Sequence, residues 1–262
     1  MAAGTLDPTL DDRLRLTRRP DGRAVMHQRW EHLLFLHWEV PAAALARLLP
    51  DGLEVDRHEG RAYVGLVPFT MAGVRPAGLP SVPGLSDFHE TNVRTYVRTP
   101  DGVPGVWFFS LDAAGLVGSL LGRSWFRLPY FYARMGLDAD ATPGGGWSLR
   151  YESRRRYPRT PAASTLIRAE VDGPVAPAVP GSLEFFLAER YLLYAAGRRP
   201  GSLLRGRVHH SPYPLRPARL LGLEESALAA AGIDRPAAPP LAHYARRVVV
   251  EVFGLEPVPR PG

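Results

Sequence analysis

The sequence predicts an α+β protein with a curved antiparallel sheet, or β-barrel-like core, and a few flanking helices. Short segments in which apolar and polar residues alternate recur along most of the chain. Pro, Gly and Asp separate these segments, as expected of turns. Few stretches have helical spacing. Many short strands with few helices are typical of a barrel or a strongly curved sheet.

The 262 residues are enough for one large domain, and 45% of them are hydrophobic. Residues 1–28 are rich in Asp, Arg and Pro and predict a poorly anchored N-terminal arm. Residues 29–254 are expected to form one α+β domain that encloses a pocket. Residues 255–262 are expected to be a flexible tail. The segment after Met1 lacks the apolar stretch of an export signal, so we expect a cytoplasmic protein without a membrane partner.

Composition excludes several kinds of chemistry. The 32 basic residues are all arginine, and with 26 acidic residues they give a net charge of +6. Without lysine, the chain has no side chain for Schiff-base catalysis or for a lysine-bearing phosphate loop. Without cysteine, it has no thiolate ligand or cysteine nucleophile. The arginines are spread among acids, so a nucleic-acid partner is not expected.

The first half of the predicted domain reads as a helix, a hairpin and a long loop. Pro41 begins a short helix that ends near Gly52. Residues 53–58 and 61–67 predict a hairpin. Residues 75–87 form a loop long enough for a lid.

A second hairpin carries the main polar row. Phe88–Thr99 and Val106–Ala113 flank a Pro-Asp-Gly turn. With an odd-length turn and regular pairing, one face carries a polar and aromatic set. Its members are Glu90, Asn92, Arg94, Tyr96, Phe108, Ser110 and Asp112. This row is either a ligand site, with Arg94 holding a carboxylate and Glu90 as acid or base, or a solvent-facing row.

Further strands are expected over residues 147–156, 165–172, 203–209 and 244–253, with a helix over Leu183–Ala196. Arg190 falls within the apolar stripe of that helix. A buried charge needs a partner, which would be Asp112, Glu90 or a ligand anion. Alternatively, Arg190 extends to the rim of the domain.

Adjacent His209 and His210 would point to opposite faces of a strand, so they do not suit one metal ion. We expect neither a metal nor a cofactor. His210 remains a candidate acid, base or ligand donor.

An ordered set of motifs between about Trp30 and Leu215 resembles the YqjF-like family of unknown function, domain-of-unknown-function family 2071. The set comprises residues 67–69, 90–97, 105–113, 128–130, 182–184, 189–191 and 210–214. Tyr213 stands where a tryptophan is expected. The family is similar in fold to acetoacetate decarboxylase, which implies a barrel-like domain around a pocket. By similarity of place, Glu90 resembles the acidic group of that pocket, whereas the catalytic lysine has no counterpart.

We therefore expect a pocket for a small anionic or carbonyl-bearing organic molecule. The anion would bind Arg94 and Arg190, the acid or base would be Glu90, Asp112 or His210, and further ligand contacts would come from Asn92, Tyr96 and Tyr130. Catalysis without lysine, a binding or sensing module without turnover, and an interaction protein that uses the face of Arg154–Arg156 all remain open. The sequence leaves the oligomeric state open.

Overall fold

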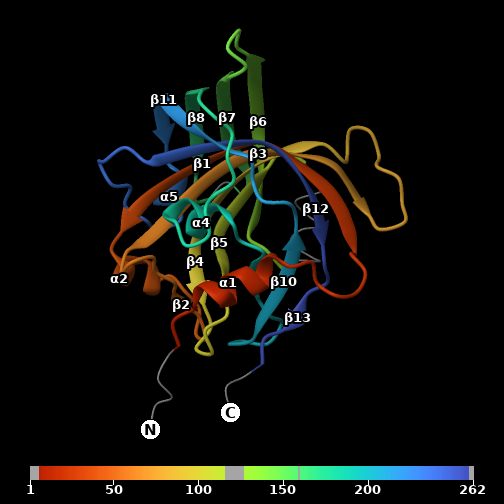
Figure 1. Ribbon diagram of the computed structural model, residues 1–262, viewed down its shortest axis with the longest axis vertical. Helices are drawn as coiled ribbons and strands as arrows, with labels where there is room; N and C mark the ends of the chain where they lie inside the picture. Colours follow the sequence, from red (N-terminus) through yellow and green to blue (C-terminus); the bar gives the residue numbers. More distant parts are fainter. Residues whose placement is uncertain (1–5, 116–126, 159, 260–262) are drawn as a thin grey trace.

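The computed structural model describes residues 6–115, 127–158 and 160–259 (Figure 1). Its helices are α1 (Leu10–Thr17), α2 (Ala42–Ala46), α4 (Leu183–Ala188) and α5 (Ala227–Ala230). Its strands are β1 (Met26–Val40), β2 (Glu54–Val55), β3 (Ala62–Pro76), β4 (Phe88–Arg98), β5 (Pro104–Ala113), β6 (Tyr130–Ala141), β7 (Trp147–Tyr157), β8 (Ser164–Val171), β9 (Leu192–Ala196), β10 (Leu203–His209), β11 (Leu215–Glu225), β12 (Leu241–Val252) and β13 (Glu256–Pro257). In these ranges no helix is long and apolar enough to cross a membrane.

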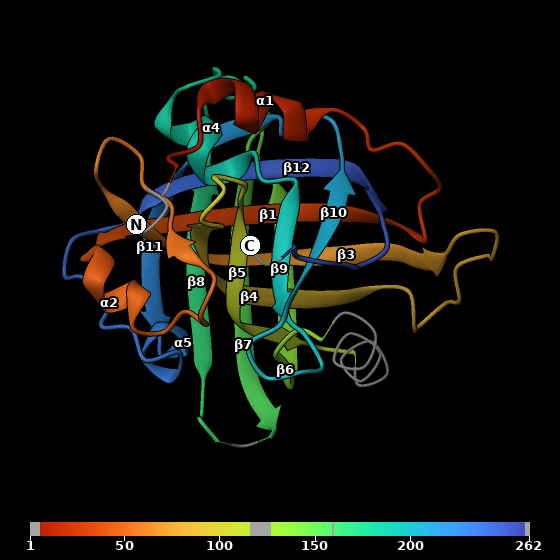
Figure 2. The same ribbon diagram turned by 90° about the horizontal axis from the view of Figure 1, so that it is seen from below.

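The sheet closes on itself in two rings, which confirms the α+β class with a β-barrel core. The small ring consists of β12, β1, β3, β4, β5, β9 and β10. The large ring runs from β5 through β6, β7, β8 and β11 back to β12, and it shares β12, β1, β3, β4 and β5 with the small ring. Most pairs are antiparallel, but β5 pairs in parallel with β6 and with β9. In Figure 2 the shared strands β12, β1, β3 and β4 lie side by side.

Each shared strand contributes side chains to both rings. On β1, Leu34 and Leu36 pack with Tyr151 in the core of the large ring, whereas Leu33 and Phe35 face the small ring. Because successive strand residues point to opposite faces, β3 and β4 are buried on both faces over most of their length. Near-continuous burial makes the sequence of β3 read as an apolar run, whereas β4 buries polar side chains such as Glu90, Asn92 and Arg94.

A β-bulge in β5 corrects the predicted polar face. Glu90 pairs with Ala113 and Val93 with Ser110, but Arg94 pairs with Phe108, so Phe109 is an extra residue. The bulge reverses the alternation along β5. The prediction that Asp112 shares a face with Glu90 is therefore wrong, because the parity argument holds only for regular pairing.

The predicted helix over Leu183–Ala196 is also wrong beyond Ala188. The Ser182 hydroxyl does cap α4 by accepting a hydrogen bond from the Phe185 amide at 3.2 Å. After Glu189 and Arg190, however, the chain continues as β9 between β5 and β10. Pairing on both sides outweighs the local helical spacing, which is a weak determinant by comparison.

The predicted hairpin over residues 53–67 keeps its turn but not its pairing. His58 and Arg61 exchange backbone hydrogen bonds of 2.9 Å around Glu59 and Gly60. The strand before that turn, β2, pairs instead with β4. The helix predicted after Pro41 is present as α2.

The described parts of the predicted arm and tail are attached to the barrel. α1 begins with a capping box between Thr9 and Asp12. It lies beside α4 in both views, with the Arg13 guanidinium 5.0 Å from the Phe186 ring (Figures 1 and 2). β1 already starts at Met26, and β13 pairs with β10. The described residues of the predicted arm (1–28) and tail (255–262) therefore contact the barrel, so neither predicted boundary marks the end of the folded domain.

Candidate functional site

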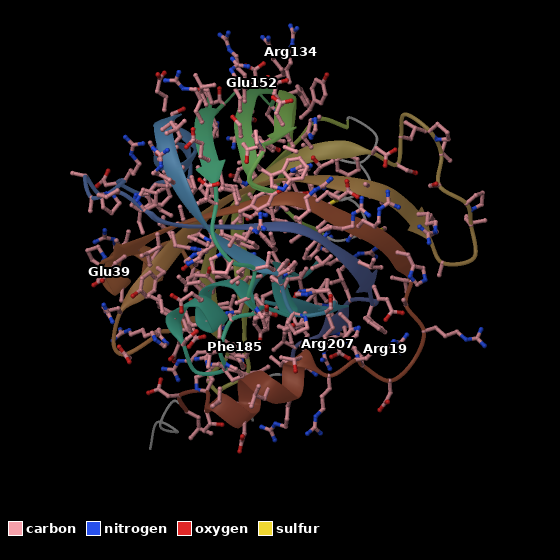
Figure 3. The ribbon with its side chains drawn as sticks, turned by 45° about the horizontal axis from the view of Figure 1, so that its top comes forward. Arg19, Glu39, Arg134, Glu152, Phe185 and Arg207 are labelled. Carbon is pink, nitrogen blue, oxygen red and sulfur yellow. The ribbon has the colours of Figure 1, made fainter. Side chains whose placement is uncertain are left out.

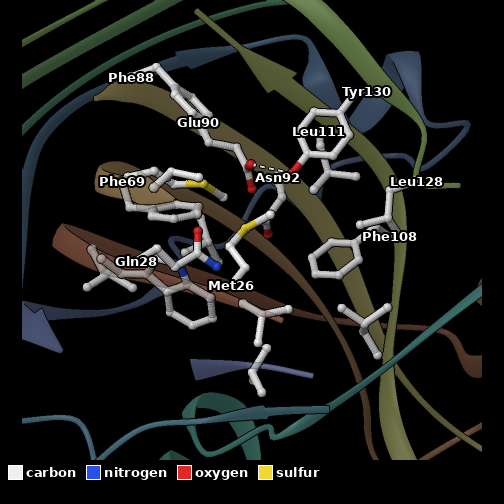
Figure 4. Close-up of a pocket in the computed structure, with 18 of the residues that line it drawn as sticks. Met26, Gln28, Phe69, Phe88, Glu90, Asn92, Phe108, Leu111, Leu128 and Tyr130 are labelled. Carbon is white, nitrogen blue, oxygen red and sulfur yellow. Dashed lines mark hydrogen bonds between the residues drawn. The ribbon is translucent and has the colours of Figure 1, made fainter. Parts of the chain in front are cut away.

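A cavity of about 300 Å³ lies inside the small ring. Its wall comes from the shared strands, from β9 and β10, from the start of β6 and from the loop between β3 and β4, and most of the lining side chains are apolar. The polar lining residues are Gln28, Ser86, Glu90, Asn92, Arg94, Tyr130, Arg190 and Tyr213. A mainly apolar cavity with a few convergent polar groups is the usual form of a small-molecule site. Figure 4 shows Gln28, Glu90, Asn92 and Tyr130 among the lining residues.

Glu90 is the buried carboxyl group of the cavity wall, with 1% of its surface exposed. The Tyr130 hydroxyl donates a hydrogen bond of 2.9 Å to Glu90 Oε2 (Figure 4). Burial raises the pKa of Glu90 to about 7, although hydrogen bonds from Tyr130 and Asn92 act in the opposite direction. Near pH 7, Glu90 can therefore both donate and accept a proton.

Asn92 lies two residues further along β4, on the same face. Its amide oxygen is buried without a hydrogen-bond partner among the described residues. A buried acceptor without a partner costs free energy, so Asn92 is available to a ligand donor.

Arg94 follows on the same face and is 8% exposed. Its Nη2 donates to the carbonyl of Leu187 at 3.0 Å, and its guanidinium lies 5.6 Å from the Phe35 ring. Within the described ranges, its Nε has no partner and no carboxylate forms an ion pair with it. Arg94 is thus a buried cation beside the cavity without a counter-ion, an arrangement that favours an anion there.

Tyr96 is fully buried, but it does not line the cavity. Its hydroxyl donates to the Leu187 carbonyl at 2.6 Å and accepts from His37 Nε2 at 2.6 Å. Burial and the nearby Arg94 hold the pKa of His37 well below its usual value, so His37 is neutral. Tyr96 thus fixes the carbonyl that Arg94 also contacts, rather than touching a ligand as predicted.

Arg190 is buried beside the cavity, and its predicted need for a partner is confirmed. The partner is Asp56, whose Oδ2 lies 3.0 Å from Arg190 Nη1, not Asp112 or Glu90. Arg13 of α1 binds the same carboxylate through both terminal nitrogens, at 2.7 and 2.8 Å. Burial lowers the pKa of Arg190 to about 10, so it remains protonated at neutral pH.

The Asp112 side chain faces the interior of the large ring, on the opposite side of β5 from the cavity. Its Oδ1 accepts a hydrogen bond of 2.9 Å from Arg155 Nε. Both side chains are buried. The predicted basic face of Arg154–Arg156 is therefore incomplete, because Arg155 is buried while Arg154 and Arg156 are exposed. Asp112 is therefore not a group that a ligand in the cavity would touch.

His210 also lies outside the cavity lining. Its Nδ1 donates to the Ser211 carbonyl at 2.7 Å, and its ring stacks on Tyr191 at 4.5 Å. Burial lowers the pKa of His210 to about 4. Its ring lies 4.5 Å from that of Tyr213 and 5.8 Å from that of Trp30, both lining residues. His210 therefore supports the cavity wall as a neutral group.

Sequence reasoning missed three polar groups of this region. Gln28 lines the cavity although it was assigned to the arm. Asp56 follows a short strand, and nothing local indicates its distant partner Arg190. Glu189 accepts the backbone amide of Tyr213 at 2.8 Å and thereby fixes a lining residue. Two signals were available: a buried Arg needs an acid, and Glu189 falls within the motif of residues 189–191.

Comparison with known proteins places the chain within a recognised group. Residues 27–249 match the model of DUF2071, described as an uncharacterized conserved protein. The chain is 37% identical over 228 residues to the uncharacterized protein YqjF of Bacillus subtilis (strain 168), covering 87% of this chain and 90% of YqjF.

Solved structures share the fold at low identity. An acetoacetate decarboxylase-like enzyme from Sphingomonas wittichii RW1 has a TM-score of 0.61 at 14% identity, over 92% of this chain and 95% of its own. The acetoacetate decarboxylase of Legionella pneumophila has a TM-score of 0.58 at 12% identity, over 99% and 98%. The enduracididine biosynthesis enzyme MppR, complexed with pyruvate, has a TM-score of 0.58 at 15% identity, over 90% and 91%.

Proposed function

The chain belongs to the DUF2071 family, and we propose that its cavity binds a small organic carboxylate. The carboxylate binds Arg94, and the remainder of the molecule lies among the apolar side chains of the small ring. The observation that carries this proposal is the buried guanidinium of Arg94, which has no counter-ion among the described residues. Guanidinium groups bind carboxylates through parallel hydrogen bonds, which suits this position.

Electrostatics around Arg94 support an anionic ligand. Arg13 and Arg190 share the single carboxylate of Asp56. The guanidinium groups of Arg94 and Arg190 lie 5.8 and 4.8 Å from the same Tyr96 ring, so this region has excess positive charge. A bound anion offsets part of that excess, and in a site with little water the attraction is stronger than at a surface. The pyruvate in MppR shows that one protein of this fold holds a small carboxylate.

The test compares an acid with its neutral amide. Hexanoate and hexanamide have nearly the same shape, and isothermal titration calorimetry measures the affinity of each. We expect hexanoate to bind more tightly, and Arg94→Met to weaken hexanoate binding by at least about tenfold, because hydrogen bonds to charged groups are among the stronger ones. The control Arg134→Met changes an exposed arginine on β6 (Figure 3) and leaves binding unchanged. Equal binding of acid and amide would overturn the proposal.

A second candidate function, proton transfer, rests on Glu90. Its pKa of about 7 and its place beside the cavity suit it to remove a proton from the carbon next to a carbonyl group and to return it. The lysine-free sequence excludes a lysine imine, so decarboxylation of acetoacetate by that route is not expected.

Deuterium exchange separates catalysis from binding alone. In D2O, a 2-oxo acid such as 2-oxobutanoate should exchange its C3 protons faster with the protein than without it, as followed by proton NMR. Glu90→Gln should remove the acceleration, because an amide is a poor base. Tight binding without accelerated exchange would instead identify a binding or sensing protein.

A further inference from the structure

The cavity has a charged end and an apolar end, arranged along β4. Phe88, Glu90, Asn92 and Arg94 face it in turn. A strand rises by about 3.3 Å per residue, so the backbone positions of Phe88 and Arg94 are roughly 20 Å apart. The backbone carrying the polar pair Glu90 and Asn92 lies between these ends.

The apolar end opens beneath the loop between β3 and β4. Val82 and Leu85 of this loop line the cavity and are nevertheless 50% and 55% exposed. Leu79 of the same loop is 58% exposed. The loop extends from the barrel beyond β3 and β4 (Figures 1 and 2). Apolar side chains that both border a cavity and contact water mark its mouth.

Hydrogen bonds hold this loop in place. The Val82 amide donates to Ser86 Oγ at 2.7 Å, and the Ser86 amide donates to the Val82 carbonyl at 2.9 Å. The Val74 amide donates to the Ser86 carbonyl at 2.9 Å, which fixes the loop to the end of β3. The Asp87 carboxylate accepts the amide of Gly73 at 2.7 Å. Val82 and Leu85 are thus presented at the mouth by a formed turn.

We propose that the ligand is an amphipathic carboxylic acid that binds lengthwise. Its carboxylate contacts Arg94, its chain passes Asn92 and Glu90, and its hydrocarbon tail contacts Val82 and Leu85 at the mouth. This proposal rests on the proposed function and adds the ligand class and the specificity-determining side chains. A tail at the mouth covers apolar surface that is otherwise in contact with water.

Chain length is the variable that tests this arrangement. Calorimetry with butanoate, octanoate, dodecanoate and hexadecanoate, each below its micelle concentration, should show affinity rising about fourfold per methylene group until the chain leaves the cavity. The double variant Val82→Ser with Leu85→Ser should leave butanoate affinity within about twofold and weaken hexadecanoate by at least about fivefold, since only an acid of about this length spans the roughly 20 Å from Arg94 to the mouth. Leu221→Ser, a similarly exposed leucine on β11 outside the lining, is the matched control.

The outcomes separate this inference from the proposed function. Equal affinities for butanoate and hexadecanoate, or an equal loss at every chain length in the double variant, would overturn the lengthwise arrangement while short acids still bind through Arg94. If no acid binds more tightly than its amide, the proposed function itself fails.

Discussion

Arg13 and Arg190 bind the same carboxylate, that of Asp56, although they lie 177 positions apart in the sequence. Arg13 belongs to α1, whereas Arg190 lines the cavity. The N-terminal helix is therefore connected to the charged end of the cavity through one buried group.

Asp56→Asn should destabilise the protein strongly. Its pKa is held below the usual value because hydrogen bonds and charge from Arg13 and Arg190 outweigh its burial. Loss of the charge leaves Arg190 buried without a counter-ion, which costs about 3–5 kcal/mol of unfolding free energy. Urea denaturation at pH 7 measures the loss. Asp51→Asn, at an exposed position, should stay within about 0.5 kcal/mol of the parent protein.

Glu90 should make stability depend on pH in a defined window. Its pKa is raised by burial from 4.5 to about 7, so the folded state binds the proton more tightly than the unfolded state does. The stabilisation is complete below pH 4.5 and is lost as the pH rises to about 7. Relative to Glu90→Gln, the unfolding free energy should fall by up to about 3 kcal/mol across that window. A difference independent of pH would contradict the assignment, and Glu39→Gln at the surface provides the control.

Arg94→Met should stabilise the ligand-free protein. The substitution removes a buried charge that lacks a counter-ion, and the Leu187 carbonyl keeps its hydrogen bond from Tyr96. We expect the unfolding free energy to rise by about 1–3 kcal/mol. Arg94→Lys keeps the charge and should not show the gain. Destabilisation by both variants would indicate that Arg94 is structural and not reserved for a ligand.

Asp112 and Arg155 should matter for stability but not for binding. Asp112→Asn leaves Arg155 buried without its ion pair and should cost about 3–5 kcal/mol. The double variant Asp112→Leu with Arg155→Met should recover most of that loss, because it removes both charges. Under conditions in which both proteins are fully folded, the Asp112→Asn variant should bind hexanoate within about twofold of the parent affinity, because Asp112 faces the interior of the large ring. A large loss of affinity would place Asp112 back at the ligand.

Local patterns in the sequence predict the strands and part of the cavity wall. Alternation along one strand suffices to put Glu90, Asn92 and Arg94 on one face, and the structure has all three at the cavity together with Tyr130 and Arg190. The family resemblance indicates the barrel, which strand patterns alone leave open.

The errors come from effects that depend on distant residues. The extra residue Phe109 has no sequence signature, yet it turns Asp112 away from Glu90. The sequence of β9 has helical spacing, but the segment is a strand because it pairs with β5 and β10. Asp56 and Arg190 meet only through the folded topology, so the sequence indicated that a partner was needed without indicating which one.

The strands shared by the two rings restrict how this family can diversify. Changing the size of a side chain on β3 or β4 alters either the shape of the cavity or the packing of the core in the large ring, depending on which face of the strand carries it. By contrast, β9, β10 and the loop between β3 and β4 border the cavity without belonging to the large ring. Relatives that accept different ligands should therefore differ first in these segments, and engineered changes of specificity have the most freedom there.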